Sequence, residues 1–515
     1  MHFRFYSVVA AANLFPLFFL NSFFNSKSMT EKITFREKIG FSLGDAAANF
    51  IFQTIMLLQL SFYTNTFGIS AAAIAVLFLV GRLVGAFADP VMGVIADRTE
   101  TRWGKFRPWI LWTAVPFGII GFLAFYTPDM EQTGKVIWAF ATYVLLMLVY
   151  SANNIPYAAL GGVITGDQKQ RNSIFSIRFV FVVLATIAIQ GFAIPMVNHF
   201  GKGDSAKGYM ITMGIFSALA MLFFLLTFSW TKERVKPSPE QKQSLKQDIS
   251  DLLHNSQWVI MFLVFLMLFI FLAIRNGMLL FYFQYYLDGP SMNSFMTSLN
   301  SSLGGFLKII GLAGENAVAS DSVFGITNIF GQLAAILGIV VSNLLVNRMG
   351  KRNVFIFGLA LAAVFAVMFY VVSPSAILIV LILQILFNFS WGITMQVPWA
   401  MMADVADYSE WKYNRRSTAI VFAGVVIGLK VGLAIGGAIS SLLLKWYGYL
   451  APPAKVSWVE QTPGAVEGIR LSTSIYPALA VIAVIVLLFF YRITKSKEIE
   501  IQNELAERRK AYGNN

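Results

Sequence analysis

A charged helix inside an apolar chain decides how this sequence folds. Residues 81–108 read GRLVGAFADPVMGVIADRTETRWGKFRP. Arg82 and Asp89 lie in the apolar part of this stretch. An ionisable group there costs about 2.5–3.5 kcal/mol on insertion scales, so it normally faces a bundle interior or a water-filled path. Asp89 is therefore a functional candidate from its position alone.

Composition indicates a polytopic membrane protein. The 515 residues are 57% hydrophobic and only 13% charged, and the mean hydropathy is +0.67. The net charge of +13 lies in short loops between apolar runs rather than on one face or tail, which argues against a nucleic-acid partner. The sequence has no cysteine, which excludes disulfides and thiolate metal sites, and it shows no cofactor or metal motif.

Twelve apolar runs reach the roughly 20 residues that a membrane span needs. They cover residues 38–64, 70–97, 108–127, 134–164, 171–196, 207–230, 257–287, 322–346, 353–372, 375–403, 416–445 and 471–493. The sequence predicts an all-α protein with an N-terminal six-helix bundle (29–231) and a C-terminal six-helix bundle (257–493). The long charged loop 232–256 is predicted to be a cytoplasmic linker, 288–321 an external insertion and 494–515 a cytoplasmic tail.

Lysine and arginine placement predicts the orientation. These residues are concentrated in the loops after the even-numbered spans of the first ten, which places both termini in the cytoplasm. Residues 1–28 fit poorly, because a thirteenth span there would put basic residues outside. This extension is either a signal-like or interfacial segment, or a misassigned start before Met29. RTETRWGKFRP (98–108) is echoed by NRMGKRN (347–353), as expected of parallel repeats.

Four motifs carry a family resemblance. They are REKIGFSLGDAAANF (36–50), DPVMGVIADRTETRWGKFRPWIL (89–111), NNIPYAALGGVITGD (153–167) and MMADVADYSEW (401–411). With these motifs in this order, the chain resembles the glycoside-pentoside-hexuronide:cation symporters, the melibiose permease-like branch of the major facilitator superfamily. The resemblance implies two six-helix bundles around a central cavity and transport of a saccharide together with H⁺ or Na⁺.

The resemblance also implies a coupling-ion site on the second span. Asp89 matches one family carboxylate, while Gly85 and Ala88 replace a second aspartate and an asparagine, and Ser151 matches a hydroxyl from the fourth span. Sodium usually takes about five or six oxygens, by analogy with other hard cations, so we expect a proton. A carboxylate neutralised by Arg82, or one that caps a kink at the following proline, remains the alternative.

Sugar-binding residues follow from the same resemblance. Asn49 and Asn154 stand where the family has aspartates, and Asp45 lies one turn before Asn49, where we expect it to replace part of the lost carboxylate function at the coupling site. Amides both donate to and accept from sugar hydroxyls. The other matched positions are Tyr150, Arg178 and Lys430, whereas Ala158 replaces a stacking tryptophan.

Charges at membrane depth predict a positive cavity. At membrane depth the sequence places four cations, Arg82, Arg178, Arg275 and Lys430, and two carboxylates, Asp45 and Asp89. Unpaired buried cations are unfavourable, so an acidic saccharide such as a uronide is one hypothesis. The alternative is that some of these side chains snorkel or bond to backbone carbonyls.

Other charged residues are predicted to form gates at the cytoplasmic end. They are Asp97, Arg98, Arg102 and Lys105 in the first half, and Asp404, Asp407, Glu410 and Arg416 in the second. Two rival functions remain open: a lipid or lysolipid transporter of the related melibiose permease-like type, and a sugar sensor without transport. A monomer in the lipid bilayer is expected.

Overall fold

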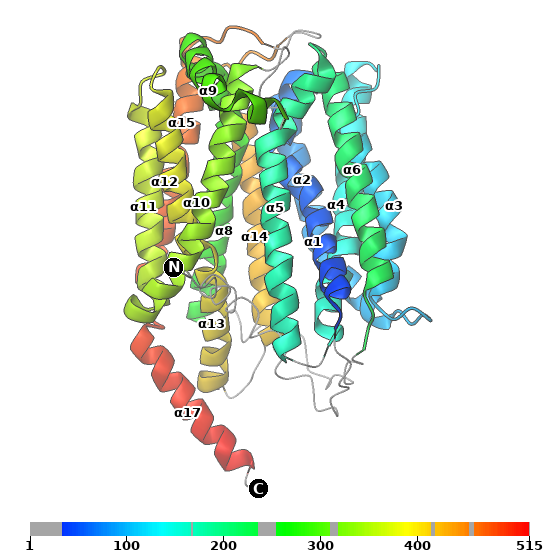
Figure 1. Cartoon of the computed structure of the whole chain (residues 1–515). Helices are drawn as coiled ribbons and strands as arrows, with labels where there is room; N and C mark the ends of the chain where they lie inside the picture. The colour runs from blue at the N-terminus through cyan, green and yellow to red at the C-terminus, as the bar shows by residue number, and fades with distance from the viewer. Residues whose placement is uncertain are drawn as a thin grey trace, which may run out of the picture.

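The architecture is a bundle of long helices (Figure 1). The computed structural model describes residues 33–165, 168–234, 254–309, 318–413, 418–452 and 458–513. In these ranges the chain is helical apart from its loops and one isolated bridge, between Thr101 and Gly104. The predicted N-terminal extension and most of the predicted linker lie outside the described residues.

The first half supplies six crossings. They are α1 (Phe35–Ser61) continued by the π-helical turn η2 (Phe62–Phe67), α2 (Ala71–Arg98), α3 (Arg107–Leu123), α4 (Gln132–Val163), α5 (Gln168–Gly201) and α6 (Ser205–Trp230). Side-chain caps fix two of the starts. Thr34 Oγ1 accepts the N–H of Glu37 at 3.2 Å, and Ser70 Oγ accepts the N–H of Ala73 at 3.3 Å, each satisfying a helix-start donor.

In the described ranges the second half adds six more crossings and two peripheral helices, α9 (Gly289–Ile309) and α17 (Lys495–Gly513). The crossings are α8 (Ser256–Phe281) with η3 (Tyr282–Tyr286), α10 (Ala319–Met349), α11 (Lys351–Val371), α12 (Ile377–Met395) with α13 (Val397–Tyr413), α14 (Thr418–Trp446), and α15 (Pro463–Thr473) with α16 (Ile475–Phe489). In Figure 1, α9 and α15 lie at the upper end, and α17 leaves the lower end, where α1 begins.

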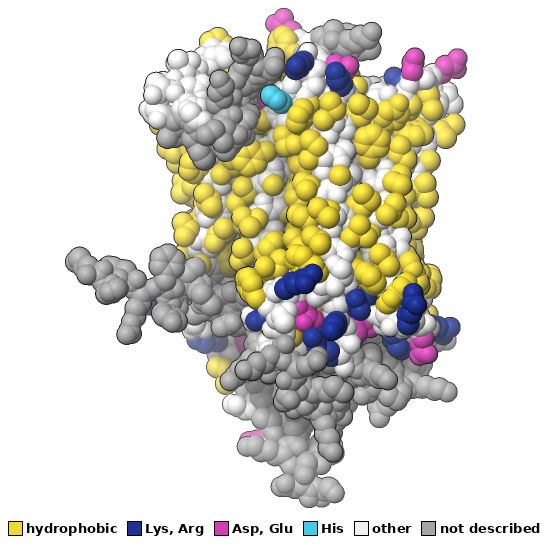
Figure 2. Space-filling view, turned by 45° about the vertical axis from the view of Figure 1, so that its right-hand side comes forward, with side chains coloured by type: hydrophobic (Ala, Val, Ile, Leu, Met, Phe, Trp, Pro, Cys, Tyr) yellow, Lys and Arg dark blue, Asp and Glu magenta, His cyan; other side chains and the backbone are white. Residues whose placement is uncertain are grey.

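Length and composition match a membrane protein. In the described ranges, eleven helices are long and apolar enough to span a bilayer, and the apolar α3, 17 residues long, takes the remaining position. Figure 2 shows an apolar belt with lysines and arginines along its lower rim. Large apolar side chains such as Phe87 and Leu337 are exposed on the surface of the described helices. The predicted all-α polytopic class is confirmed.

The two halves meet along three helix pairs. These are α2 with α14, α5 with α10, and α1 with α8. Within the halves, α1 packs on α5 and α6, and α10 packs on α12. All helices of these pairs except α2 contribute residues to a cavity between the halves.

The sequence echo after the second span of each half is also a structural repeat. Gly104 and Gly350 both have positive φ, at 111° and 79°, a region that glycine enters without a Cβ clash. Glu233, which follows α6, accepts the N–H groups of Lys105, Phe106 and Arg107 at 2.8 Å. Correspondingly, Glu498, which follows α16, pairs with Lys351 at 2.8 Å. In each half, the chain after the last span thus binds the start of the third.

Close helix packing rests on small residues. A Cβ at Gly392 would lie 2.1 Å from the carbonyl oxygen of Ala335, and one at Gly338 would lie 2.1 Å from that of Phe389. These paired glycines let the backbones of α10 and α12 approach, as small residues do in membrane bundles.

We expect Gly392→Ala to lower the thermal unfolding midpoint of the detergent-purified protein. Overpacking costs about 1–3 kcal/mol and occasionally more, and here the obstacle is backbone, which cannot rotate away. Gly93→Ala is the control, because a Cβ there would meet nothing nearer than Ile155 Cγ2, at 3.9 Å. Equal midpoints for the two variants, measured by tryptophan fluorescence, would contradict the packing argument.

Candidate functional site

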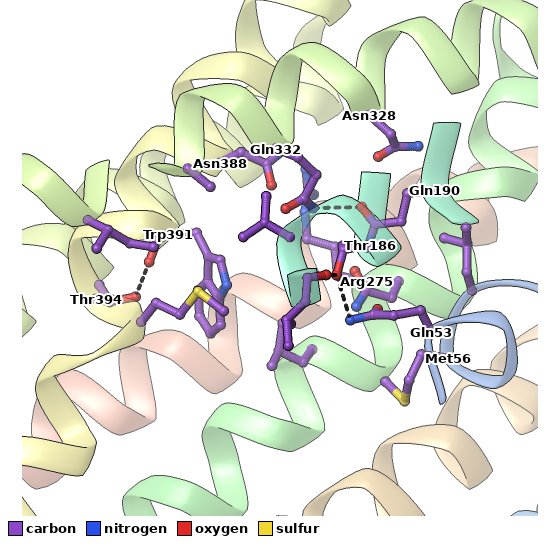
Figure 3. Close-up of a pocket in the computed structure, with 18 of the residues that line it drawn as sticks. Gln53, Met56, Thr186, Gln190, Arg275, Asn328, Gln332, Asn388, Trp391 and Thr394 are labelled. Carbon is purple, nitrogen blue, oxygen red and sulfur yellow. Dashed lines mark hydrogen bonds between the residues drawn. The ribbon is translucent and has the colours of Figure 1, made fainter. Parts of the chain in front are cut away.

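A cavity of about 250 Å³ lies between the two bundles, and its walls combine apolar side chains with hydroxyl and amide groups. Its walls come from α1 and α5 of the first half and from α8, α10, α12, α13 and α14 of the second. Figure 3 shows the polar side chains that project towards it. The hydroxyl and amide residues of the lining are Gln53, Thr186, Gln190, Asn276, Asn328, Gln332, Gln384, Asn388 and Thr394.

Helical spacing places these groups on the cavity wall. Asn328 and Gln332 are four residues apart on α10, and Gln384, Asn388 and Trp391 recur at four and three residues on α12, so each set shares a face. Sequence reasoning missed these residues. The signal that could have found them is polar residues at helical spacing inside apolar spans.

Asp89 forms an ion pair with Lys430, which joins α2 to α14 across the bundle interface. Lys430 Nζ also donates to the carbonyl oxygen of Gly85 at 3.3 Å, and Ser151 Oγ donates to the same oxygen at 3.2 Å. Asp89 Oδ1 is buried and has no hydrogen-bond partner in the described part of the chain. Lys430, which the family resemblance assigns to the sugar, therefore bonds both to the predicted coupling-site residue Asp89 and to the Gly85 carbonyl, which also accepts from Ser151.

Asp45 lies at a second site, between α1 and α5. Arg178 Nε donates to Asp45 Oδ2 at 2.5 Å, and Asn49 Nδ2 donates to the Asp45 backbone oxygen at 2.9 Å. Gln53 Nε2 then contacts Asn49 Oδ1 at 3.4 Å and Thr186 Oγ1 at 3.3 Å. Since Gln53 and Thr186 line the cavity, this polar chain connects the ion pair to it.

The two remaining intramembrane arginines bond to neutral acceptors. Arg82 Nε donates to the hydroxyl of Tyr143 at 3.1 Å, and its Nη1 donates to the carbonyl oxygen of Leu433 at 2.5 Å. Arg275 donates to the Thr473 carbonyl and to Gln384 Oε1, both at 2.8 Å. Both arginines thus donate to backbone carbonyls, which is one of the alternatives that the sequence allows for these cations. The partner of Asp89 is Lys430 rather than Arg82.

Two other predicted sugar residues lie beside this region. The Tyr150 ring packs near Phe52, with centroids 6.0 Å apart, and near Phe117, at 6.1 Å. Asn154 is half-buried on α4. Neither residue is among those that line the 250 Å³ cavity.

Two hydrogen bonds join the halves at the upper end, one to Asp321 and one from Tyr449. Asn198 of α5 donates to Asp321 of α10 at 2.5 Å, and Gln284 donates to the other oxygen of Asp321 at 3.0 Å. The Tyr449 hydroxyl donates to Asn65 Oδ1 at 2.8 Å. In the sequence, Asp321 is only the last residue of the predicted insertion. Its partners Asn198 and Gln284 cannot be recognised there, because they are distant along the chain.

The predicted gate residues have varied surroundings. Asp404 pairs with Lys351 at 2.6 Å, and Asp407 is buried. Arg98 and Arg102 are exposed, and Lys105 lies 4.0 Å from an oxygen of Glu100. The side chain of Asp97 and all of Arg416 lie outside the described residues.

Two six-helix bundles around a central cavity with amides in its wall define the class, a major facilitator transporter rather than an enzyme. Residues 40–314 and 315–495 match the family model described as MFS/sugar transport protein. The chain belongs to this family.

Similar proteins agree with that assignment. The putative glycoside/cation symporter YagG of Escherichia coli (strain K12) is 34% identical over 482 residues, 94% of this chain and 97% of that protein. The isoprimeverose transporter of Lactiplantibacillus pentosus is 31% identical over 467 residues, 90% of each. The fold is similar to the inward-facing, unoccupied structure of a bacterial homologue of the human lysosomal transporter Spinster, with a TM-score of 0.61, 15% identity and coverage of 91% of this chain and 99% of that one.

Proposed function

We propose that this chain is a secondary active transporter that imports a glycoside, pentoside or hexuronide together with a cation, by alternating access. The observation that carries the proposal is the amide-rich cavity between the bundles. Amides supply both donors and acceptors to sugar hydroxyls. The names of the two relatives, a glycoside/cation symporter and an isoprimeverose transporter, support the same assignment.

We propose a proton as the coupling ion. Around Asp89, the Gly85 carbonyl already accepts from Lys430 and Ser151, and the Lys430 ammonium repels a second cation. A sodium ion would need about five or six oxygens, by analogy with other hard cations, whereas a proton needs one. The partnerless Oδ1 of Asp89 supplies that one among the described residues.

Protonation of Asp89 couples to movement through the ion pair. The pair holds α2 to α14, and a neutral carboxyl removes the charge that attracts Lys430. The lysine is then free to donate to a sugar oxygen, as the family resemblance implies. A proton on Asp89 and a sugar oxygen at Lys430 together take the place of the ion pair. The bundles therefore separate at this point only when both the proton and the sugar are bound.

The substrate we favour is a neutral saccharide. The ion pairs to Asp45 and Asp89 neutralise two of the four intramembrane cations, and nine uncharged polar residues line the cavity beside Arg275. A uronide is the second candidate, since the Arg275 guanidinium is part of the lining. We propose that the protein is a monomer in the bacterial inner membrane with both termini in the cytoplasm. The basic lower rim in Figure 2 supports this orientation.

The two rival functions predict other observations. A lipid carrier needs an apolar lateral cleft, whereas this cavity lies centrally and carries amides from both bundles. A sensor would bind sugar without moving it. Transport by a reconstituted protein separates the sensor from the symporter.

We expect counterflow of a neutral glycoside in proteoliposomes, with net uptake driven by an inward proton gradient and not by a sodium gradient. The panel is isoprimeverose, methyl xylosides, methyl galactosides and a glucuronide. Vesicles without protein are the control. Sodium-driven uptake without pH dependence would overturn proton coupling, and a stronger response to the glucuronide would overturn the neutral-substrate proposal.

A further inference from the structure

Arg82 is a buried cation that neither the sugar cavity nor the coupling pair uses. Its side chain is only 8% exposed, and it is not among the residues that line the 250 Å³ cavity. The carboxylate of Asp89 pairs with Lys430 instead. Because a charge at membrane depth is costly and usually serves a transport step, we asked what the charge of Arg82 does at this place.

We propose that Arg82 is an electrostatic barrier to protons, placed between Asp89 and the upper end of the bundle. While α2 and α14 are joined, it keeps Asp89 from exchanging protons with the upper side, so that no proton crosses the membrane without sugar. The inference rests on the proposed function, because it concerns the same coupling site. It adds the residue that prevents uncoupled proton flow.

Arg82 lies between Asp89 and the upper end of α2. This helix starts at the upper end, where α1 finishes (Figure 1), and Asp89 follows Arg82 by seven residues. Seven α-helical residues rise about 10 Å and make almost two turns, so both side chains lie on nearly the same face. That face meets α14, where Leu433 accepts from Arg82 and Lys430 pairs with Asp89. A proton that follows this interface from the upper end passes Arg82 before it reaches Asp89.

Neutral groups surround the charge of Arg82. Its Nε donates to the Tyr143 hydroxyl at 3.1 Å, and its Nη1 donates to the Leu433 carbonyl at 2.5 Å. Its Nη2 lies 3.4 Å from Met56 Sδ, and its guanidinium lies 5.7 Å from the centroid of the Phe78 ring. Among the described residues none of these partners is a carboxylate. Neutral partners stabilise the cation without cancelling its charge, so the guanidinium still repels a proton.

The space beside Arg82 is narrow. A cavity of about 10 Å³ lies between α1, α2, α8 and α14, and its wall includes Arg82, Phe78 and Ser440. This volume gives room for about one water molecule. In a passage of that width a fixed positive charge forms an electrostatic barrier to protons and other cations.

The barrier depends on how the two bundles are placed. Leu433 belongs to the second bundle, so its bond to Arg82 joins the halves. When the bundles separate at their upper end, this bond breaks and Arg82 moves away with α2. Asp89 is then accessible from the upper side, as proton loading requires, and the barrier returns when the halves join again.

The test is proton influx into proteoliposomes that contain the full chain and no sugar. A potassium gradient with valinomycin sets the membrane potential, and enclosed pyranine reports the internal pH. We expect Arg82→Gln to admit protons about tenfold faster than the wild type. This is the factor expected from repulsion between two unit charges about 10 Å apart at an effective dielectric constant of about 20. Arg82→Lys keeps the charge and should remain close to the wild type.

Two further variants separate the charge from the structure. Tyr143→Phe removes one hydrogen bond of Arg82 but no charge, so it should not leak. Arg82→Gln combined with Asp89→Asn should lose the leak, because the leaking protons pass through Asp89. A leak that comes from misfolding would persist in this double variant.

The outcomes distinguish the barrier from the proposed function. Arg82→Gln and Arg82→Met that leak no faster than a wild type with sugar-dependent proton uptake would overturn the inference alone. So would an equal leak through Arg82→Lys, or a leak that survives Asp89→Asn. A wild type that transports sugar without moving protons would overturn proton coupling as well.

Discussion

Asp89→Asn is expected to abolish accumulation of sugar against a gradient while counterflow continues. Asparagine keeps the shape of the side chain but cannot take and release a proton near neutral pH. Sugar exchange needs only the cavity, which Asp89 does not line, whereas uphill transport needs the ion. The measurement is accumulation under an imposed pH gradient, compared with counterflow in the same vesicles.

The ion pair calls for a second variant in this experiment. Asp89→Asn alone leaves the ammonium of Lys430 without the carboxylate that pairs with it, and removing one partner of an ion pair away from bulk water is destabilising, because the other charge stays uncompensated. Asp89→Asn with Lys430→Met removes both charges and should restore the unfolding midpoint without restoring accumulation. Proton-driven accumulation by either variant would refute the assignment of Asp89 as the coupling site.

The helix pattern was predictable because it depends on local composition. Twelve apolar runs in the sequence correspond to the eleven long helices and α3, and the cap at Ser70 lies directly before its helix. These features need no knowledge of distant residues. The confirmed class follows from them and from the four sequence motifs.

Pairing between helices was not predictable in the same way. Four cations and two carboxylates can be placed at membrane depth from the sequence, but which of them meet depends on the rotation of each helix in the bundle. Lys430 is 341 positions after Asp89 by their numbering, and no local rule joins them. For the same reason the sequence does not show that Glu233, which follows α6, accepts three backbone N–H groups at the start of α3.

The two ion pairs also imply different roles, because only one of them connects to the cavity. Asp45 and Arg178 both belong to the first bundle, and Asn49 and Gln53 continue their bonding to Thr186 in the lining. Asp89 and Lys430 instead join the two bundles. Loss of Asp45 should therefore appear in sugar affinity, and loss of Asp89 in coupling.

Asp45→Asn is expected to weaken driven uptake and counterflow together, by about 10- to 100-fold, because a hydrogen bond to a charged group contributes about 1.5–3 kcal/mol. Asparagine has one side-chain oxygen in place of two, so it cannot both pair with Arg178 and accept from Asn49 as Asp45 does. The position of Asn49 and of Gln53 beyond it is then less fixed, so the Michaelis constant for the sugar should rise. Initial rates of counterflow over a range of sugar concentrations measure this. Unlike Asp89→Asn, the variant should keep proton-coupled accumulation at saturating sugar.

The Glu37–Arg234 pair provides the matched control for this variant. Arg234 Nη1 donates to Glu37 Oε1 at 2.6 Å, in the same bundle, and neither residue is among those that line the cavity. Glu37→Gln should lower the unfolding midpoint but leave the Michaelis constant unchanged, since it breaks an ion pair with no path to the sugar. If Glu37→Gln and Asp45→Asn raise the Michaelis constant equally, the Asp45 pair acts on stability alone and the polar chain through Asn49 carries no specificity.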